Sequence, residues 1–199
     1  MSTVGASVAG HRVEPLSPGT WDAFADLAER HNGVWGGCWC AFFHCYPDPS
    51  ERRQLGNREF KHYLVQQGRA HAALVFDGDV AVAWAEYGPV AELPNIHHRK
   101  QWEQEVITMP DYRITCLFVD RRYRRNGMAS VAVRGTLALI GQGGGGLVES
   151  YPHDVPPGKK TSSSFLYNAT RTMYERLGFT YERPKGKGNC VMSMMVAPT

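Results

Sequence analysis

The sequence predicts one folded domain of mixed α/β class. Three observations lead to this expectation. The 199 residues are 43% hydrophobic with a formal net charge of only +3, which excludes low-complexity disorder. An Asp-Gly turn at Asp77-Gly78 separates two apolar runs, as in a β-hairpin. Apolar residues after Gly127 recur every three or four positions, as in an amphipathic helix. No repeat or linker divides residues 1–199, so we expect a single domain.

Composition also narrows the class of protein. The pI near 8.6 is mildly basic, but Lys and Arg form no long block, so we expect no nucleic-acid partner. No apolar run approaches the ~20 residues of a membrane span, and Met1–Gly10 lacks the features of a signal or transit peptide. Five irregularly spaced cysteines suit reduced thiols. We therefore expect a cytoplasmic protein without membrane contact.

The first third of the chain is expected to be mainly helical. A helix is predicted over Thr20–Arg30, with Thr20 as N-cap, and a second helical stretch runs from Ser50 toward Gln67 and ends at Gly68. Between them, residues 33–46 are rich in Trp, Phe, Cys and Gly and show no clean period. This part is expected to be irregular or partly helical.

Strands dominate the middle of the chain. Ala70–Phe76 and Val80–Tyr87 are predicted as the two strands of the hairpin. Residues 88–111 form a long connection with a helical piece around 99–106, and Tyr112–Val119 is the next strand.

The last third alternates helices and strands. A helix following Asn126 is expected to stop at Gly141, and the glycines at 143–146 are a connector. A helix over Ser164–Leu177 is predicted from apolar residues in register every four positions, with Ser162–Ser164 as candidate caps. The remaining predicted strands are Leu147–Tyr151, Phe179–Glu182 and Cys190–Val196.

The turn from Asp120 to Asn126 carries the clearest chemical signal. It joins a strand to a helix, contains four arginines and is followed by Gly127. Glycine lets the backbone approach a ligand, while the first N–H groups of a helix are unpaired and lie at the positive end of its dipole. The turn is therefore a candidate anion site. The simpler alternative is a solvated basic turn that only caps the helix.

Two motifs here resemble the GNAT superfamily of acyl-CoA-dependent N-acyltransferases. Arg124-x-x-Gly127-x-Ala129 is similar to the family's pyrophosphate-binding pattern Q/R-x-x-G-x-G/A, and Met173–Phe179 is similar to its late helix ending. Together they cover about residues 70–196. The resemblance implies a twisted, largely antiparallel central sheet, flanked by helices, in which one parallel strand pair splays apart.

The resemblance also implies a site for acetyl-CoA as co-substrate, without a metal. By similarity, main-chain groups at the end of one splayed strand pair with the pantetheine arm, and N–H groups of the following turn hold the pyrophosphate. Asn168 departs from the family pattern, because it lies six residues before Tyr174 and many family members have Asn seven before. The expected cofactor-binding residues are Leu117, Phe118, Val119, Arg124, Arg125, Asn126, Gly127, Met128, Ala129, Ser130 and Asn168.

Two catalytic residues are expected. Tyr174 matches the position of the family's frequent general acid, which protonates the departing thiolate; the alternative is a packing tyrosine. Glu149 is the candidate base, and Glu86 competes with it. Water could also accept the proton, and either glutamate could instead be a structural carboxylate.

The acceptor side is expected in the aromatic segment before residue 47. Trp35, Trp39 and Phe43, together with Glu86, are candidate substrate-binding residues, although the aromatic residues could simply form core. The cysteines of this segment lack the paired spacing of a zinc site. The expected function is acetyl transfer to an amine of a small molecule or peptide, by direct attack in a ternary complex. The alternative is an acyl-CoA-binding sensor or partner-binding protein without catalysis. A homodimer is plausible only because symmetric dimers are common.

Overall fold

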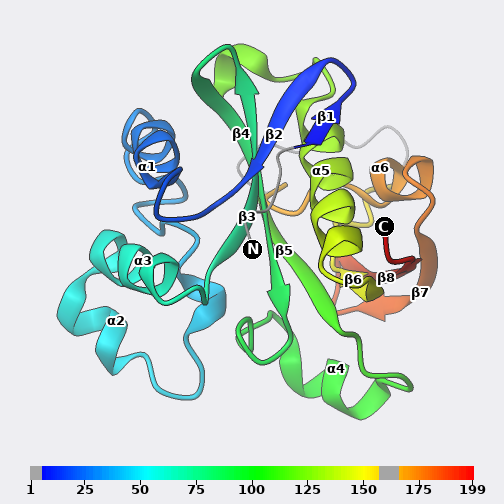
Figure 1. Ribbon diagram of the computed structural model, residues 1–199. Coiled ribbons are helices and arrows are strands. Elements are labelled where there is room, and N and C mark those ends of the chain that lie inside the picture. Colours follow the sequence, from blue (N-terminus) through cyan, green and yellow to red (C-terminus); the bar gives the residue numbers. More distant parts are fainter. Residues whose placement is uncertain (1–5, 157–165) are drawn as a thin grey trace.

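The computed structural model describes residues 6–156 and 166–199. Within these residues the strands form one eight-stranded sheet in the order β1-β2-β3-β4-β5-β6-β8-β7 (Figure 1). Every neighbouring pair is antiparallel except β5 and β6, which are parallel. The expected mixed class, with a largely antiparallel sheet and one parallel pair, is therefore confirmed. The strands are β1 (Ala6–Val8), β2 (His11–Pro15), β3 (His71–Asp77), β4 (Val80–Pro89), β5 (Tyr112–Val119), β6 (Gly146–Ser150), β7 (Thr180–Lys185) and β8 (Asn189–Val196).

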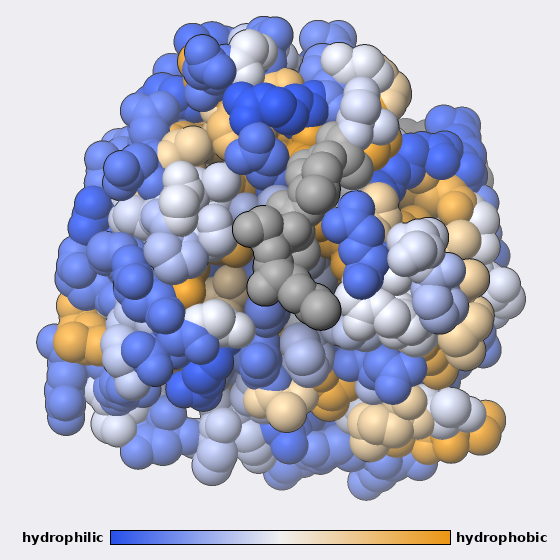
Figure 2. Space-filling model, in the orientation of Figure 1, coloured by the Kyte–Doolittle hydropathy of each residue, from blue (hydrophilic) through white to orange (hydrophobic). Residues whose placement is uncertain are grey.

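Helices cover both faces of the sheet (Figure 1). Helices α1 to α3 lie on one side and α5 on the other, and each side has its own apolar core. The helices are α1 (Trp21–Glu29), α2 (Ser50–Leu55), α3 (Asn57–Gln66), α4 (Arg99–Glu105), α5 (Met128–Gln142) and α6 (Arg171–Arg176), with short 3₁₀ turns η1 (Phe42–His44) and η2 (Arg121–Tyr123). On the face shown in Figure 2, hydrophilic residues dominate and apolar ones appear in scattered patches.

Several expected elements are present where local signals were strong. The β3–β4 hairpin turns at Gly78, which has a φ of 57°. Helix α5 follows the Asp120–Asn126 turn and buries an apolar face against β3 and β4. It also lies close to β2, because Gly135 has no side chain: a Cβ there would be 2.5 Å from Cγ1 of Val13.

Of the helix expected over Ser164–Leu177, the described residues form only the last part, Arg171–Arg176. Helix α6 begins only at Arg171, because Ala169 has a φ of 54° and Thr170 is extended. The Thr170 hydroxyl accepts the N–H of Met173 and so caps the helix. The serines expected as caps, Ser162–Ser164, and much of the connection from Pro152 to Ser163 lie outside the described residues.

Two other expectations are corrected. The helical stretch expected from Ser50 to Gln67 is divided into α2 and α3 at Gly56, whose φ is 80°. Strands β1 and β2 are additional: their residues carried no strand prediction, and their pairing with one another and with β3 defines them.

Candidate functional site

Strands β5 and β6 part shortly after they pair. They are in register at three positions, the last being Ile114 with Ser150. On the other side of β5, Ile114 and Cys116 have consecutive partners on β4, so Thr115 between them forms a bulge. A bulge bends its strand and increases its twist, which carries β5 away from β6.

Beyond Ile114, β5 has an open edge on the β6 side, where no strand of the described residues pairs with it. Residues Cys116–Val119 have no partner on β6. The N–H of Leu117 instead donates to the carbonyl oxygen of Tyr167, 2.6 Å away, in the loop before α6. The edge is therefore able to pair with an extended chain, and Tyr167 occupies one of its donors.

The turn from Asp120 to Asn126 is held by its own side chains and leads directly into α5. Asp120 ends β5 and its carboxylate accepts the N–H and guanidinium of Arg122, which holds the pKa of Asp120 well below its usual value. Arg125 and Gly127 have φ values of 66° and 79°, and α5 follows for fifteen residues. The first helical acceptor is Gly127, which receives the N–H of Val131. The N–H groups at the start of α5, ahead of Val131, lie at the positive end of the helix dipole.

One cavity of about 740 Å³ joins the open edge to this helix start. We call it the main cavity. It brings together most of the predicted cofactor-binding residues; Asn126 and Asn168 are not among its lining residues. The lining residues are Trp35, Leu117, Phe118, Val119, Tyr123, Arg124, Arg125, Gly127, Met128, Ala129, Ser130, Leu166, Ala169, Thr170 and Met173.

Tyr174 is not among the residues that line the main cavity, although its neighbour Met173 is. The side chain is fully buried, and its hydroxyl donates to Oδ1 of Asn168 at 3.0 Å. Nδ2 of Asn168 in turn donates to the carbonyl of Ile114 at 3.2 Å, where β5 and β6 separate. Burial raises the pKa of the Tyr174 phenol, so the hydroxyl keeps its proton at neutral pH.

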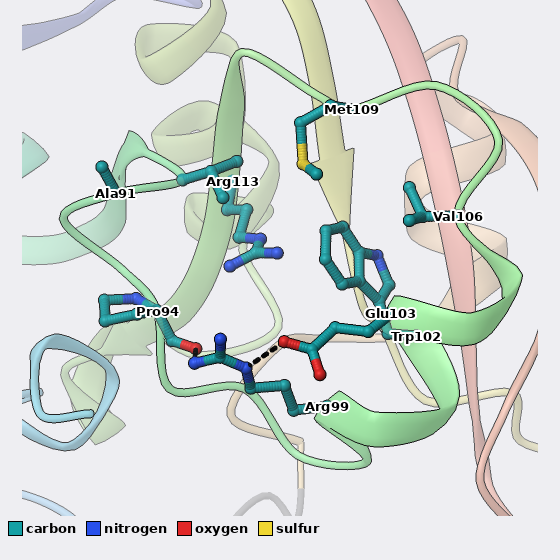
Figure 3. A pocket seen from close by; sticks show the side chains of 9 residues that line it. Ala91, Pro94, Arg99, Trp102, Glu103, Val106, Met109 and Arg113 are labelled. Carbon is teal, nitrogen blue, oxygen red and sulfur yellow. Dashed lines mark hydrogen bonds and ion pairs between the residues drawn. The ribbon is translucent and has the colours of Figure 1, made fainter. Parts of the chain in front are cut away.

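Glu149 is held in a buried polar group beside β5. Its Oε2 accepts hydrogen bonds from Nε1 of Trp102 at 2.7 Å and from the hydroxyl of Tyr151 at 2.9 Å. Arg113 donates to the same hydroxyl, and its guanidinium lies 4.2 Å from the centre of the Trp102 ring. Figure 3 shows Arg113 and Trp102 facing a pocket of about 290 Å³ between α4 and β5. Glu149 itself lines neither that pocket nor the main cavity.

Glu86 lies in a second buried polar group. Its Oε1 is 2.5 Å from Nζ of Lys61 and 3.3 Å from Nε2 of His44, and its Oε2 accepts the hydroxyl of Thr115 at 2.8 Å. Burial raises the pKa of Glu86, but the Lys61 and His44 contacts outweigh it and hold that pKa below its usual value. Because Thr115 is the bulged residue, Glu86 also anchors the bend in β5.

The aromatic segment contributes to a second cavity, of about 180 Å³, which we call the aromatic pocket. Trp35 and Phe43 line it as the sequence suggested, whereas Trp39 does not: it is buried and stacks on Trp21 at 6.2 Å. The lining residues are Trp35, Cys38, Cys40, Phe42, Phe43, His97, Cys116 and Tyr167.

The aromatic pocket adjoins the main cavity. Trp35 lines both, and Cys116 and Tyr167 of the pocket are chain neighbours of Leu117 and Leu166 of the cavity. Sequence reasoning gave no role to His97 or Tyr167. His97 comes from the long connection before β5, and no local pattern marks a residue that reaches a pocket by tertiary packing.

Within residues 6–156 and 166–199, no group of three or more His, Cys, Asp or Glu side chains is arranged to hold a metal ion. None of the helices in those ranges has the length and apolar character needed to cross a membrane.

Comparison by sequence finds neither a matching family model nor a matching curated protein. Comparison by structure finds acetyltransferases. A protein described as histone acetyltransferase HPA2 and related acetyltransferase, from Corynebacterium glutamicum, has a TM-score of 0.54 at 14% identity over 95% of this chain and 97% of its own. The ribosomal-protein-S5-alanine acetyltransferase of Vibrio fischeri has a TM-score of 0.52 at 13% identity over 98% and 97%.

A third structure, assigned to the GNAT acetyltransferase family, comes from Desulfovibrio desulfuricans. Its TM-score is 0.50 at 16% identity, covering 93% of this chain and 99% of that one. This chain therefore has the fold of the GNAT-superfamily acetyltransferases. The resemblance seen in the two sequence motifs is confirmed at the level of the fold.

Proposed function

We propose that this protein is an acetyltransferase that binds acetyl-CoA in the main cavity and transfers the acetyl group to a primary amine. One observation carries the proposal: the open edge of β5 and the N-terminus of α5 line the same 740 Å³ cavity. Such a cavity offers main-chain hydrogen bonds to an extended arm at one end and an anion site at the other.

Different groups of the protein would bind different parts of acetyl-CoA. The backbone of Leu117–Val119 pairs with the pantetheine arm. The N–H groups at the start of α5 hold the pyrophosphate, and the nearby arginines, Arg124 and Arg125, add positive charge. The N–H of Leu117 would exchange its bond to Tyr167 for one to the ligand.

In the proposed reaction, the amine nitrogen attacks the thioester carbonyl carbon while both substrates are bound. The carbon–sulfur bond breaks, the products are an amide and CoA thiol, and the nitrogen loses one proton. Tyr174 is the proposed donor to the departing thiolate, since its buried hydroxyl is protonated. Glu149, Glu86 or a water molecule would accept the proton of the amine.

A second function is favoured by a specific observation. Tyr174 and Glu149 line neither cavity, and the glutamate already accepts two hydrogen bonds. A protein that binds acyl-CoA without catalysis, as a sensor or partner-binding protein, would be built in this way too.

The two functions are separated by two measurements on the purified protein. Thermal unfolding with acetyl-CoA, CoA and NAD tests the site: at ~100 times Kd, a ligand of the folded state adds ~2.7 kcal/mol. We expect stabilisation by the two CoA compounds and none by NAD. Thiol release with a panel of primary amines then tests catalysis. Stabilisation without thiol release from any amine would favour the binding protein, and no stabilisation at millimolar acetyl-CoA would refute both.

A further inference from the structure

The aromatic pocket is placed to hold part of an acceptor. It shares Trp35 with the main cavity, and the bond from the Leu117 N–H to Tyr167 lies at their boundary. The backbone of Leu117 is where the proposed function puts the arm that carries the acyl group. A molecule with its body in the aromatic pocket therefore needs only a short extension to reach that end.

Among the residues that the structure describes, the pocket lining carries no permanent charge. It has no Asp, Glu, Lys or Arg there; its polar groups are three thiols, one imidazole, one phenol and the indole N–H of Trp35. Burial raises the pKa of the Cys40 and Cys116 thiols, and burial raises the pKa of Tyr167 to about 12. Burial, followed by the charge of Lys185, lowers the pKa of His97. All of these groups are neutral at pH 7, so the pocket offers nothing to balance several positive charges.

One carboxylate acts electrostatically on the pocket thiols, and it is already paired. Besides burial, Glu86 also raises the pKa of Cys40 and Cys116, and it is paired with Lys61 and hydrogen-bonded to Thr115. It lines neither cavity. A polycationic acceptor would therefore have to lose its hydration without gaining a counter-charge.

The size and shape of the pocket favour one ring. A cavity of about 150 Å³ with an apolar lining is sufficient for benzene, and this one measures about 180 Å³. Its aromatic side chains already meet in edge and tilted contacts: Phe42 with Phe43 at 5.2 Å and Phe43 with Tyr167 at 6.2 Å. A further flat ring would extend this packing.

We infer that the aromatic pocket binds the ring of an arylalkylamine acceptor, a primary amine joined to a single aromatic ring by a short alkyl chain. This inference rests on the proposed function, because the alkyl chain is what brings the amino group to the acyl end of the main cavity.

The test compares acceptors in the thiol-release assay with acetyl-CoA. 2-Phenylethylamine is the ring-bearing probe, n-propylamine the ringless control, and spermidine and kanamycin the polycations. We expect kcat/KM for 2-phenylethylamine to exceed that of n-propylamine by at least ~10-fold, because the ring is buried. Equal or higher values for n-propylamine or a polycation, in a protein that cleaves acetyl-CoA, would overturn the inference and leave the proposed function intact.

A matched pair of variants locates the effect. Cys38 lines the pocket and is partly exposed, so Cys38→Trp can fill the space without entering a sealed core. We expect Cys38→Trp to lower kcat/KM for 2-phenylethylamine at least ~10-fold with little change for n-propylamine. Leu55→Trp, at an exposed position that lines neither cavity, is the control and should leave both values unchanged. Equal losses for both amines in Cys38→Trp would contradict the assignment of the ring to this pocket.

Binding of the ring is also measured without turnover. Saturation-transfer NMR on the unmodified protein should show contact with the ring protons of 2-phenylethylamine, weakened in Cys38→Trp. If acetyl-CoA neither binds nor is cleaved, the proposed function fails. The NMR measurement then still shows whether the aromatic pocket binds the ring. Absence of ring contact in the unmodified protein refutes the inference.

Discussion

Gly127→Ala is the sharpest test of the proposed acetyl-CoA site. Gly127 has a φ of 79° and lines the main cavity, and a Cβ there would meet no protein atom within 4 Å. The methyl group therefore enters open space at the anion site, where it would exclude phosphate oxygens from the start of α5. Its conformational cost to the protein alone is ~1 kcal/mol, or about 2–4 °C in Tm for a chain of this size.

The effect on binding is separable from that cost. For the unmodified protein, acetyl-CoA at ~100 times Kd adds ~2.7 kcal/mol, which is about 5–11 °C. If Gly127→Ala raises Kd at least ~10-fold, the same concentration adds only ~1.4 kcal/mol, about 3–6 °C. Gly68→Ala is the matched control, since Gly68 has a φ of 65°, an equally open Cβ position and no part in the cavity. A full shift in Gly127→Ala would refute the placement of the pyrophosphate.

Three other predictions concern buried polar groups. Tyr174→Phe should lower kcat at least ~100-fold while the loss of its bond to Asn168 costs only ~1 kcal/mol in urea unfolding; an unchanged kcat with a true acceptor would remove Tyr174 from catalysis. Lys61→Met should lower the free energy of unfolding by about 3–5 kcal/mol, because it leaves the Glu86 carboxylate buried and unpaired. The double variant Lys61→Met/Glu86→Gln should recover part of that free energy. A loss below ~1 kcal/mol for Lys61→Met alone would contradict the ion pair. Burial, followed by the charge of Arg113, lowers the pKa of Lys185 to about 7. Between pH 7 and ~10 the unfolded chain therefore binds more protons than the folded protein, and the free energy of unfolding should rise with pH. Lys185→Met should lack this rise, and parallel pH curves for the two proteins would show that Lys185 titrates normally.

Local sequence signals predicted the elements that depend on local interactions. The hairpin at Asp77-Gly78 and the strand, turn and helix from Tyr112 to Gln142 are such cases. Two apolar runs specify the hairpin and a periodic apolar face specifies the helix, and in each case the turn contains a glycine with a positive φ.

The region before α6 shows where such signals fail. An apolar residue at every fourth position predicted a helix through Ala169, which instead takes a left-handed conformation. His153 donates its N–H to the carbonyl of Ala169 and accepts the N–H of Arg171. These long-range bonds compete with helix formation, and tertiary context decides between the two.

The sequence by itself predicted the fold class, the strand, turn and helix from Tyr112 to Gln142 and most of the residues that line the main cavity, because these residues are close in sequence. Only the tertiary structure decided the environments of the two glutamates. Glu149 is bonded to Trp102, 47 residues away, and Glu86 to Lys61, 25 residues away. Only the tertiary structure, too, brought His97 and Tyr167 to the aromatic pocket. A buried side chain's charge, proton and neighbours depend on which distant segments pack against it, and no local pattern encodes that.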